Sequence, residues 1–187
     1  WSEIGSSDEL SALSSVATEN LIEAAVSGAM QQVESGCEAR GYSLRERVGA
    51  ACWRLEQQTC ADLVAQWLSL ERERSVSFRV VEMEQNQTLQ VEGLSLTLRP
   101  DRIDEFADGR RAVIDYKTRA PSRTRWLGDR PQEPQLPLYS LLDASIQGIA
   151  FAELSTTDPV RFIGLGEELG LGNGDDKSLE QQTRSVR

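Results

Sequence analysis

The apolar positions of the N-terminal part recur every three or four residues, which is the spacing of a helix. This pattern runs from a capping signal at Ser7 to about Val33 and predicts one or two helices there. Gly36 and Gly41 are expected to interrupt the pattern. A further helical run begins at Ser43 and closes in the charged segment Glu71-Arg72-Glu73-Arg74.

The hydrophobic period changes to two after Ser77, as is typical of strands. The first three predicted strands are expected to begin a β-meander. A turn signal, Asp108-Gly109, separates the last two and marks them as a hairpin. The strands are expected at 78–84, 89–92, 94–98, 103–106 and 111–117.

The remaining residues predict one more helix and further strands. Residues 119–134 combine prolines with arginines and predict a loop. A helix is expected from Gln135 to about Leu142. Two strands are expected after it, at 149–154 and 160–163. Beyond Gly166 the chain is rich in Gly, Asp, Gln and Ser, which predicts a disordered tail.

Together these elements predict an α/β fold with a mixed central sheet, flanking helices and an N-terminal helical region. At 187 residues the chain suffices for one ordinary domain or for a fragment of a larger protein. We expect a helical part (1–75), a core (76–165) and a tail (166–187). No signal peptide is recognisable, and no segment has the roughly 20 apolar residues that crossing a bilayer needs. A soluble protein without a membrane partner is therefore expected.

Cysteine use and net charge limit the function classes further. Cys37, Cys52 and Cys60 are odd in number and show no C-x-x-C spacing, so reduced thiols in a cytoplasm are expected. A net charge of −10 argues at first against nucleic acid. Between Arg99 and Arg130, however, nine basic residues stand against six acidic ones. A phosphate-binding surface or a solvated basic loop would explain that window.

Candidate chemistry gathers on the predicted hairpin. Residues two apart in a strand share a face, so Asp115 and Lys117 project together while Tyr116 points away. A two-residue loop, Asp108-Gly109, would place Arg102 opposite Asp115 and align Asp104 on its face.

The alternative is a three-residue loop, Ala107-Asp108-Gly109, with Gly109 in the left-handed conformation. It would place Asp101 directly opposite Asp115, with Cβ atoms about 5 Å apart. Two such carboxylates could share one Mg²⁺ ion for phosphodiester hydrolysis, and Lys117 could orient water or offset transition-state charge. A surface ladder of salt bridges is the other reading.

Three motifs follow one another in order: Asp101-Arg102-Ile103-Asp104, Ile114-Asp115-Tyr116-Lys117-Thr118 and Gln135-x-x-x-Tyr139. The segment from about Phe78 to Tyr139 resembles the PD-(D/E)XK nuclease domain of the RecB family, including AddB-like DNA repair proteins. This resemblance implies a restriction-endonuclease-like core and a metal-dependent deoxyribonuclease, with exonuclease activity favoured. It also implies a role in DNA repair or recombination, with DNA as substrate and a helicase subunit or domain as a further partner.

The resemblance also implies roles for the residues of the first two motifs. Asp101 and Asp115 would ligate Mg²⁺ or Mn²⁺, and the backbone carbonyl of Tyr116 would complete the protein's share of the coordination. Lys117 would be the catalytic lysine. Asp104 would be a flanking position.

The third motif and the preceding strand add supporting residues. Gln135 and Tyr139, four apart on a helix, would support the site and the DNA strand, unless Tyr139 only packs the helix on the sheet. Glu84 resembles an acid often found at the end of its strand in this family, and Glu82 competes for that role. Phosphate contacts are expected on the loop, from Arg119, Arg123 and Arg125.

RecB-type nucleases usually carry an upstream histidine that also ligates the metal, and this chain has no histidine. Truncation just after that histidine is one explanation, and a degenerate site is the other. A competing hypothesis is therefore a catalytically inactive nuclease fold that binds DNA or a helicase partner. An acidic partner-binding protein unrelated to nucleic acid is a third.

Overall fold

The structure is a computed structural model that describes residues 1–127 and 130–171. Its helices are α1 (Ser7–Ala12), α2 (Ser15–Glu38), α3 (Leu44–Arg72), α4 (Arg123–Trp126) and α5 (Gln135–Tyr139), with a 3-10 turn at Glu167–Leu169. Its strands are β1 (Phe78–Met83), β2 (Gln87–Val91), β3 (Leu94–Leu98), β4 (Arg102–Phe106), β5 (Arg111–Lys117), β6 (Ile146–Glu153) and β7 (Arg161–Leu165).

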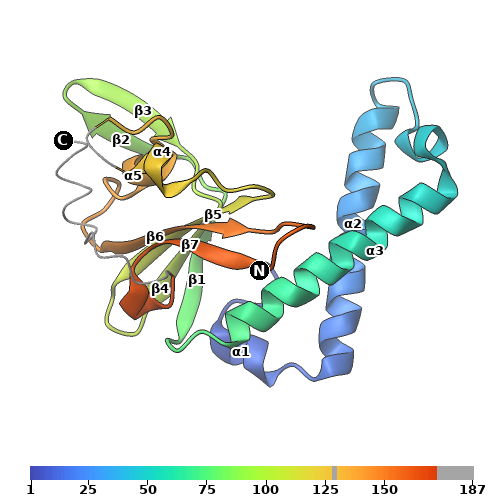
Figure 1. Ribbon diagram of the computed structural model, residues 1–187, viewed down its shortest axis with the longest axis horizontal. Coiled ribbons are helices and arrows are strands. Elements are labelled where there is room, and N and C mark those ends of the chain that lie inside the picture. Colours follow the sequence, from blue (N-terminus) through green and yellow to red (C-terminus); the bar gives the residue numbers. More distant parts are fainter. Residues whose placement is uncertain (128–129, 172–187) are drawn as a thin grey trace.

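A five-stranded mixed sheet forms the centre of the molecule, in the order β1-β4-β5-β6-β7. Strands β5 and β6 run parallel, and the other neighbours are antiparallel. The predicted α/β fold with a mixed sheet, flanking helices and an N-terminal helical region is confirmed. The predicted meander is wrong, because β1 pairs with β4 while β2 and β3 form a hairpin of their own that stands away from the sheet (Figure 1).

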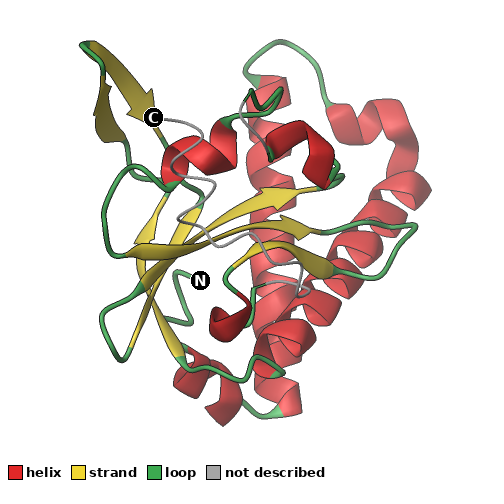
Figure 2. Cartoon of the chain, turned by 60° about the vertical axis from the view of Figure 1, so that its left-hand side comes forward, coloured by secondary structure: helices red, strands yellow, loops and turns green. Residues whose placement is uncertain are grey.

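Helices cover both faces of the sheet (Figure 2). Because side chains alternate along a strand, β5 sends Ala112 and Ile114 to one face, where they pack with Trp67 of α3. The same strand sends Val113 to the opposite face, where Trp126 and the α5 residues pack. These two buried layers fix which functional side chains of β5 lie under which helix.

The long helices α2 and α3 form a hairpin that extends beyond the sheet (Figure 1). Together with α1 they enclose a third core cluster that includes Leu10, Ile22 and Leu68. Gly36 lies inside α2, so the predicted interruption there is wrong: a glycine costs a helix only about 1 kcal/mol, which the packed face of α2 outweighs. Ser43 caps α3 as expected, since its side chain accepts a hydrogen bond from the Glu46 amide.

The C-terminal elements differ from the predictions in extent. Leu169 and Leu171 are fully buried against the sheet, so the predicted disordered tail is wrong for residues 167–171. The rest of that tail, 172–187, lies outside the described residues. Helix α5 ends at Tyr139, and the expected loop 119–134 contains α4 with the buried Trp126. The division into parts 1–75 and 76–165 stays a prediction.

None of the helices in the described part of the chain combines the length and hydropathy that crossing a bilayer requires.

Candidate active site

The turn between β4 and β5 decides which aspartate meets Asp115. The Phe106 amide donates to the Arg110 carbonyl over 2.9 Å, so the turn is the three-residue loop Ala107-Asp108-Gly109. Gly109 has a φ of 82°, a left-handed conformation that costs glycine little. With Arg102 opposite Ile114, the next pair in the register is Asp101 and Asp115. The second sequence alternative is therefore the observed one.

Asp101 is held by the main chain of β5. Its Oδ2 accepts a hydrogen bond of 2.8 Å from the Tyr116 amide, and its own carbonyl accepts one of 3.2 Å from the Glu84 amide. Asp101 is partly exposed, unlike its partner. A partly exposed carboxylate that one backbone amide orients, just before β4 begins, can accept a ligand from solvent.

Asp115 is a buried carboxylate with two side-chain neighbours. Its Oδ1 accepts a 2.6 Å hydrogen bond from Gln135 Nε2, and its Oδ2 lies 2.5 Å from Lys117 Nζ. That second contact is an ion pair without the alignment of a hydrogen bond. Burial raises the pKa of Asp115, the Asp101 carboxylate raises it further, and Lys117 offsets part of the shift.

Helix α5 ties this carboxylate pair to the strand before it. Gln135 Nε2 also donates to the Tyr139 hydroxyl over 2.9 Å, and that hydroxyl donates to the Arg99 carbonyl over 3.0 Å. Tyr139 is itself buried in the core, and burial raises the pKa of its hydroxyl. Tyr139 therefore both packs α5 on the sheet and tethers the chain just before Asp101.

A groove of about 1340 Å³ opens beside Lys117. One wall is the segment that follows β5, with Arg119 and Arg125, and the other is the turn between β6 and β7. Arg125 pairs with Glu133 at 3.0 Å, with both side chains well exposed. The side chain of Arg123 lies outside the described residues.

Neither predicted glutamate joins the carboxylate pair. Glu84 has a φ of 49°, and its exposed side chain pairs with Arg99. Glu82 accepts a hydrogen bond from Gln87 and lines a separate pocket beside Arg111. Within residues 1–127 and 130–171 no group of three His, Cys, Asp or Glu side chains is arranged to hold a metal ion.

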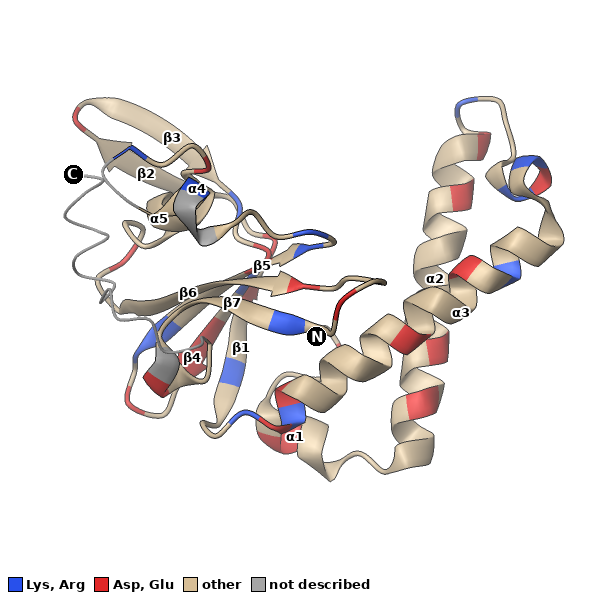
Figure 3. Cartoon of the chain, in the orientation of Figure 1, with Lys and Arg blue, Asp and Glu red and all other residues tan. Residues whose placement is uncertain are grey.

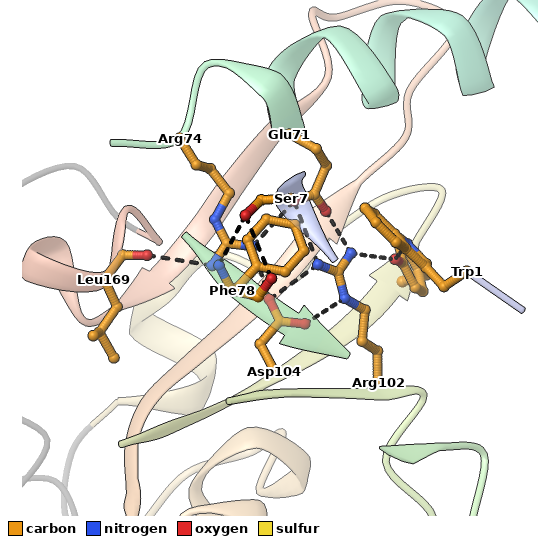
Figure 4. A network of polar contacts seen from close by, with 9 residues as sticks. Trp1, Ser7, Glu71, Arg74, Phe78, Arg102, Asp104 and Leu169 are labelled. Atoms are coloured by element: carbon orange, nitrogen blue, oxygen red, sulfur yellow. Dashed lines mark hydrogen bonds and ion pairs between the residues drawn. The ribbon is translucent and has the colours of Figure 1, made fainter. Parts of the chain in front are cut away.

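Asp104 lies on the face of the sheet opposite to the Asp101–Asp115 pair. There it takes part in a network of buried ion pairs that the sequence did not predict (Figure 4). Arg102 pairs with Asp104 and with Glu71, and Arg74 pairs with the same two acids. The signal was a pair of opposite charges, Arg102 and Asp104, two apart and so on one face of a strand. Glu71 and Arg74 belong to the charged segment that was expected only to close the helix, because nothing local shows that it faces a sheet.

A family model of the PD-(D/E)XK nuclease superfamily matches residues 7–154. This match covers well over half of the chain, so the chain belongs to the PD-(D/E)XK nuclease superfamily. Members of this superfamily are generally nucleases that use divalent metal ions and act on DNA. No curated protein matches the sequence significantly.

The donor set at the hairpin fits such an ion. Two carboxylates, Asp101 and Asp115, and the carbonyl of Tyr116 are oxygen donors of the kind that hard divalent cations prefer. Asp115 Oδ2 is buried and, in the described part of the chain, has no hydrogen-bond partner. A cation between the two acids would relieve their repulsion, and Mg²⁺ commonly keeps several waters in place of further protein ligands.

Proposed function

We propose that this chain is a RecB-type, divalent-metal-dependent deoxyribonuclease domain that hydrolyses phosphodiester bonds in DNA. The observation that carries the proposal is the hairpin register, which sets Asp101 against Asp115 with Lys117 on the same side of β5. Exonuclease action, a role in repair or recombination, a helicase partner and a cytoplasmic location belong to the same proposal.

Asp101, Asp115 and the Tyr116 carbonyl would hold Mg²⁺ or Mn²⁺. The bound ion would polarise the scissile phosphate and lower the pKa of a coordinated water. Gln135 supports the arrangement, because its bond to Asp115 Oδ1 fixes that carboxylate and leaves Oδ2, beside Lys117 Nζ, without a hydrogen-bond partner among the described residues. Gln135 is thereby assigned a positioning role.

Lys117 would stabilise negative charge that develops on the phosphate. Its side chain is 33% exposed and lies between the buried Asp115 carboxylate and the groove. When a cation neutralises Asp115, the hold of that carboxylate on the ammonium weakens. The ammonium can then orient the attacking water or contact a phosphate oxygen in the groove.

The groove is the proposed path of the DNA strand. Arg119 and Arg125 line it, together with the hydroxyl-bearing residues Ser155, Thr156 and Thr157. Exposed ion pairs such as Arg125 with Glu133 contribute at most about 1 kcal/mol, so such arginines can exchange their partner for a phosphate. Helix α2, by contrast, carries acidic and no basic residues, which makes this helix a poor surface for binding DNA (Figure 3).

An inactive nuclease fold that binds DNA or a helicase partner is the alternative proposal. Two observations favour it: the sequence has no histidine, and among the described residues no third His, Cys, Asp or Glu side chain joins the two acids. Metal affinity separates the two proposals, because a binding module has no need for Asp101 and Asp115 to hold an ion.

The test is a calorimetric titration of Mn²⁺ into the wild type and Asp115→Asn, with the exposed-site variant Asp62→Asn as control. The same proteins are then incubated with Mn²⁺ and labelled linear or closed circular DNA, single-stranded and duplex. We expect saturable binding and cleavage in the wild type and the control, and neither in Asp115→Asn. Cleavage confined to linear DNA would identify an exonuclease. A wild type that binds DNA but no Mn²⁺ would overturn the proposal of a nuclease and support that of a catalytically inactive binding module.

A further inference from the structure

Tyr116 is held from both faces of the sheet. Its backbone amide donates to Asp101 Oδ2 over 2.8 Å on the side of the carboxylate pair. Its hydroxyl, on the α3 side, accepts hydrogen bonds from Trp1 Nε1 at 2.8 Å and from Arg102 Nη1 at 3.1 Å. One residue therefore connects the candidate metal ligands to the buried ion network on the far face.

The donor on the far face is immobilised. The Arg102 side chain is fully buried, with Nε 2.6 Å from Asp104 Oδ1 and Nη1 2.5 Å from Glu71 Oε1 (Figure 4). Its guanidinium also stacks on the Trp1 ring at 3.8 Å from the ring centroid. An arginine fork fixed by two carboxylates presents its remaining N–H groups in one direction only.

The aromatic ring of Tyr116 is fixed as well. It packs edge-on against Trp67 of α3, with the ring centroids 5.6 Å apart. In a strand the direction of the Cα–Cβ bond follows the pleat of the backbone, so a phenol held at both its ring and its hydroxyl limits how far the adjoining amide and carbonyl can turn. Those are the groups that orient Asp101 and that would ligate the ion.

We propose that Arg102 and the Tyr116 hydroxyl form a positioning clamp that sets Asp101 against Asp115 and aims the Tyr116 carbonyl at the metal position. This inference rests on the proposed function. Metal sites lose affinity when their ligands are displaced by about 0.5 Å, which makes a support of this kind consequential. The clamp also links helix α3 to the site through Glu71, which binds Arg102.

Tyr116→Phe tests the clamp by removing one hydroxyl and keeping the ring. Hydrogen exchange by NMR on the metal-free protein compares the amide of residue 116 with that of Val113 in the same strand. We expect the amide at 116 to exchange about tenfold faster relative to Val113, as for the loss of one supporting hydrogen bond. Mn²⁺ binding by calorimetry should weaken about fivefold, a smaller loss because Asp101 and Asp115 remain.

Arg74→Lys is the matched control, because Arg74 belongs to the same network and contacts Glu71 and Asp104. We expect it to lower the melting temperature while the relative exchange at 116 and the Mn²⁺ affinity stay within about twofold. Unchanged exchange and affinity in Tyr116→Phe would overturn the clamp, as would equal changes in both variants. A wild type that fails to bind Mn²⁺ would overturn the proposed function, and the exchange ratio would still decide whether the phenol orders this strand.

Discussion

The two faces of the β4–β5 hairpin both bury charge, but they balance it differently. On the α3 face, Arg74 and Arg102 meet Glu71 and Asp104, and all four side chains are at most 2% exposed. On the α5 face, the Asp101 carboxylate repels that of Asp115, and the Lys117 ammonium pairs with Asp115 beside an open groove.

This difference distinguishes charged groups that stabilise the fold from charged groups that are available to bind a ligand. A balanced, closed set of ions is costly to disturb and has no capacity left for a ligand. An excess of carboxylate next to solvent is unfavourable by itself and favours a cation. The motif Asp101-Arg102-Ile103-Asp104 contributes to both faces, because its residues alternate across the sheet.

The largest expected effect is on the balanced face. Asp104→Asn should lower the free energy of unfolding by about 3–5 kcal/mol, because it leaves the buried Arg102 and Arg74 with one acid between them. Urea denaturation measures this loss, with the exposed Asp62→Asn as control. A loss below about 1 kcal/mol would mean that the network does not stabilise the sheet.

Lys117 offers the next largest effect, on activity. Lys117→Gln should reduce DNA cleavage about 10²–10³-fold with little change in melting temperature, since the side chain acts on developing charge. Steady-state kinetics should show the loss in kcat more than in KM. A protein that cleaves DNA at the wild-type rate without this ammonium would contradict its assignment.

A smaller effect of opposite sign is expected at Asp115. Its folded-state pKa is raised, so the folded protein binds more protons than the unfolded one, and stability falls as pH rises between the two pKa values. In EDTA at neutral pH, Asp115→Asn should therefore melt a few degrees above the wild type. A domain of this size gains about 2–4 °C in melting temperature for each kcal/mol of added stability. Melting curves from about pH 4 to pH 8 should converge at the acid end. A lower melting temperature at neutral pH would show that the pair with Lys117 outweighs burial.

The smallest effect is expected at Glu84. Its exposed pair with Arg99 contributes at most about 1 kcal/mol, so Glu84→Gln should leave stability nearly unchanged. Cleavage should change less than about threefold, because the exposed side chain pairs with Arg99 and with neither carboxylate of the candidate site. A loss approaching that of Lys117→Gln would restore Glu84 as a functional acid.

Local signals made much of the site predictable. The period of two in the strands placed Asp115 and Lys117 on one face, and the spacing of four placed Gln135 beside Tyr139. The turn signal Asp108-Gly109 marked the hairpin but left two registers open. Hydrogen bonding of Phe106 to Arg110 selects between them, and that choice depends on packing along the whole sheet.

The sequence by itself determined the strand and helix periods, the order of the acidic motifs and the mixed α/β class, because these depend on residues close together in the chain. Only the tertiary structure decided that β1 pairs with β4, that Leu169 and Leu171 enter the core, and that Glu71 reaches Arg102. Each of these is a contact between distant segments, and burial, which local sequence does not report, determines whether a charged residue is solvated or must find a partner.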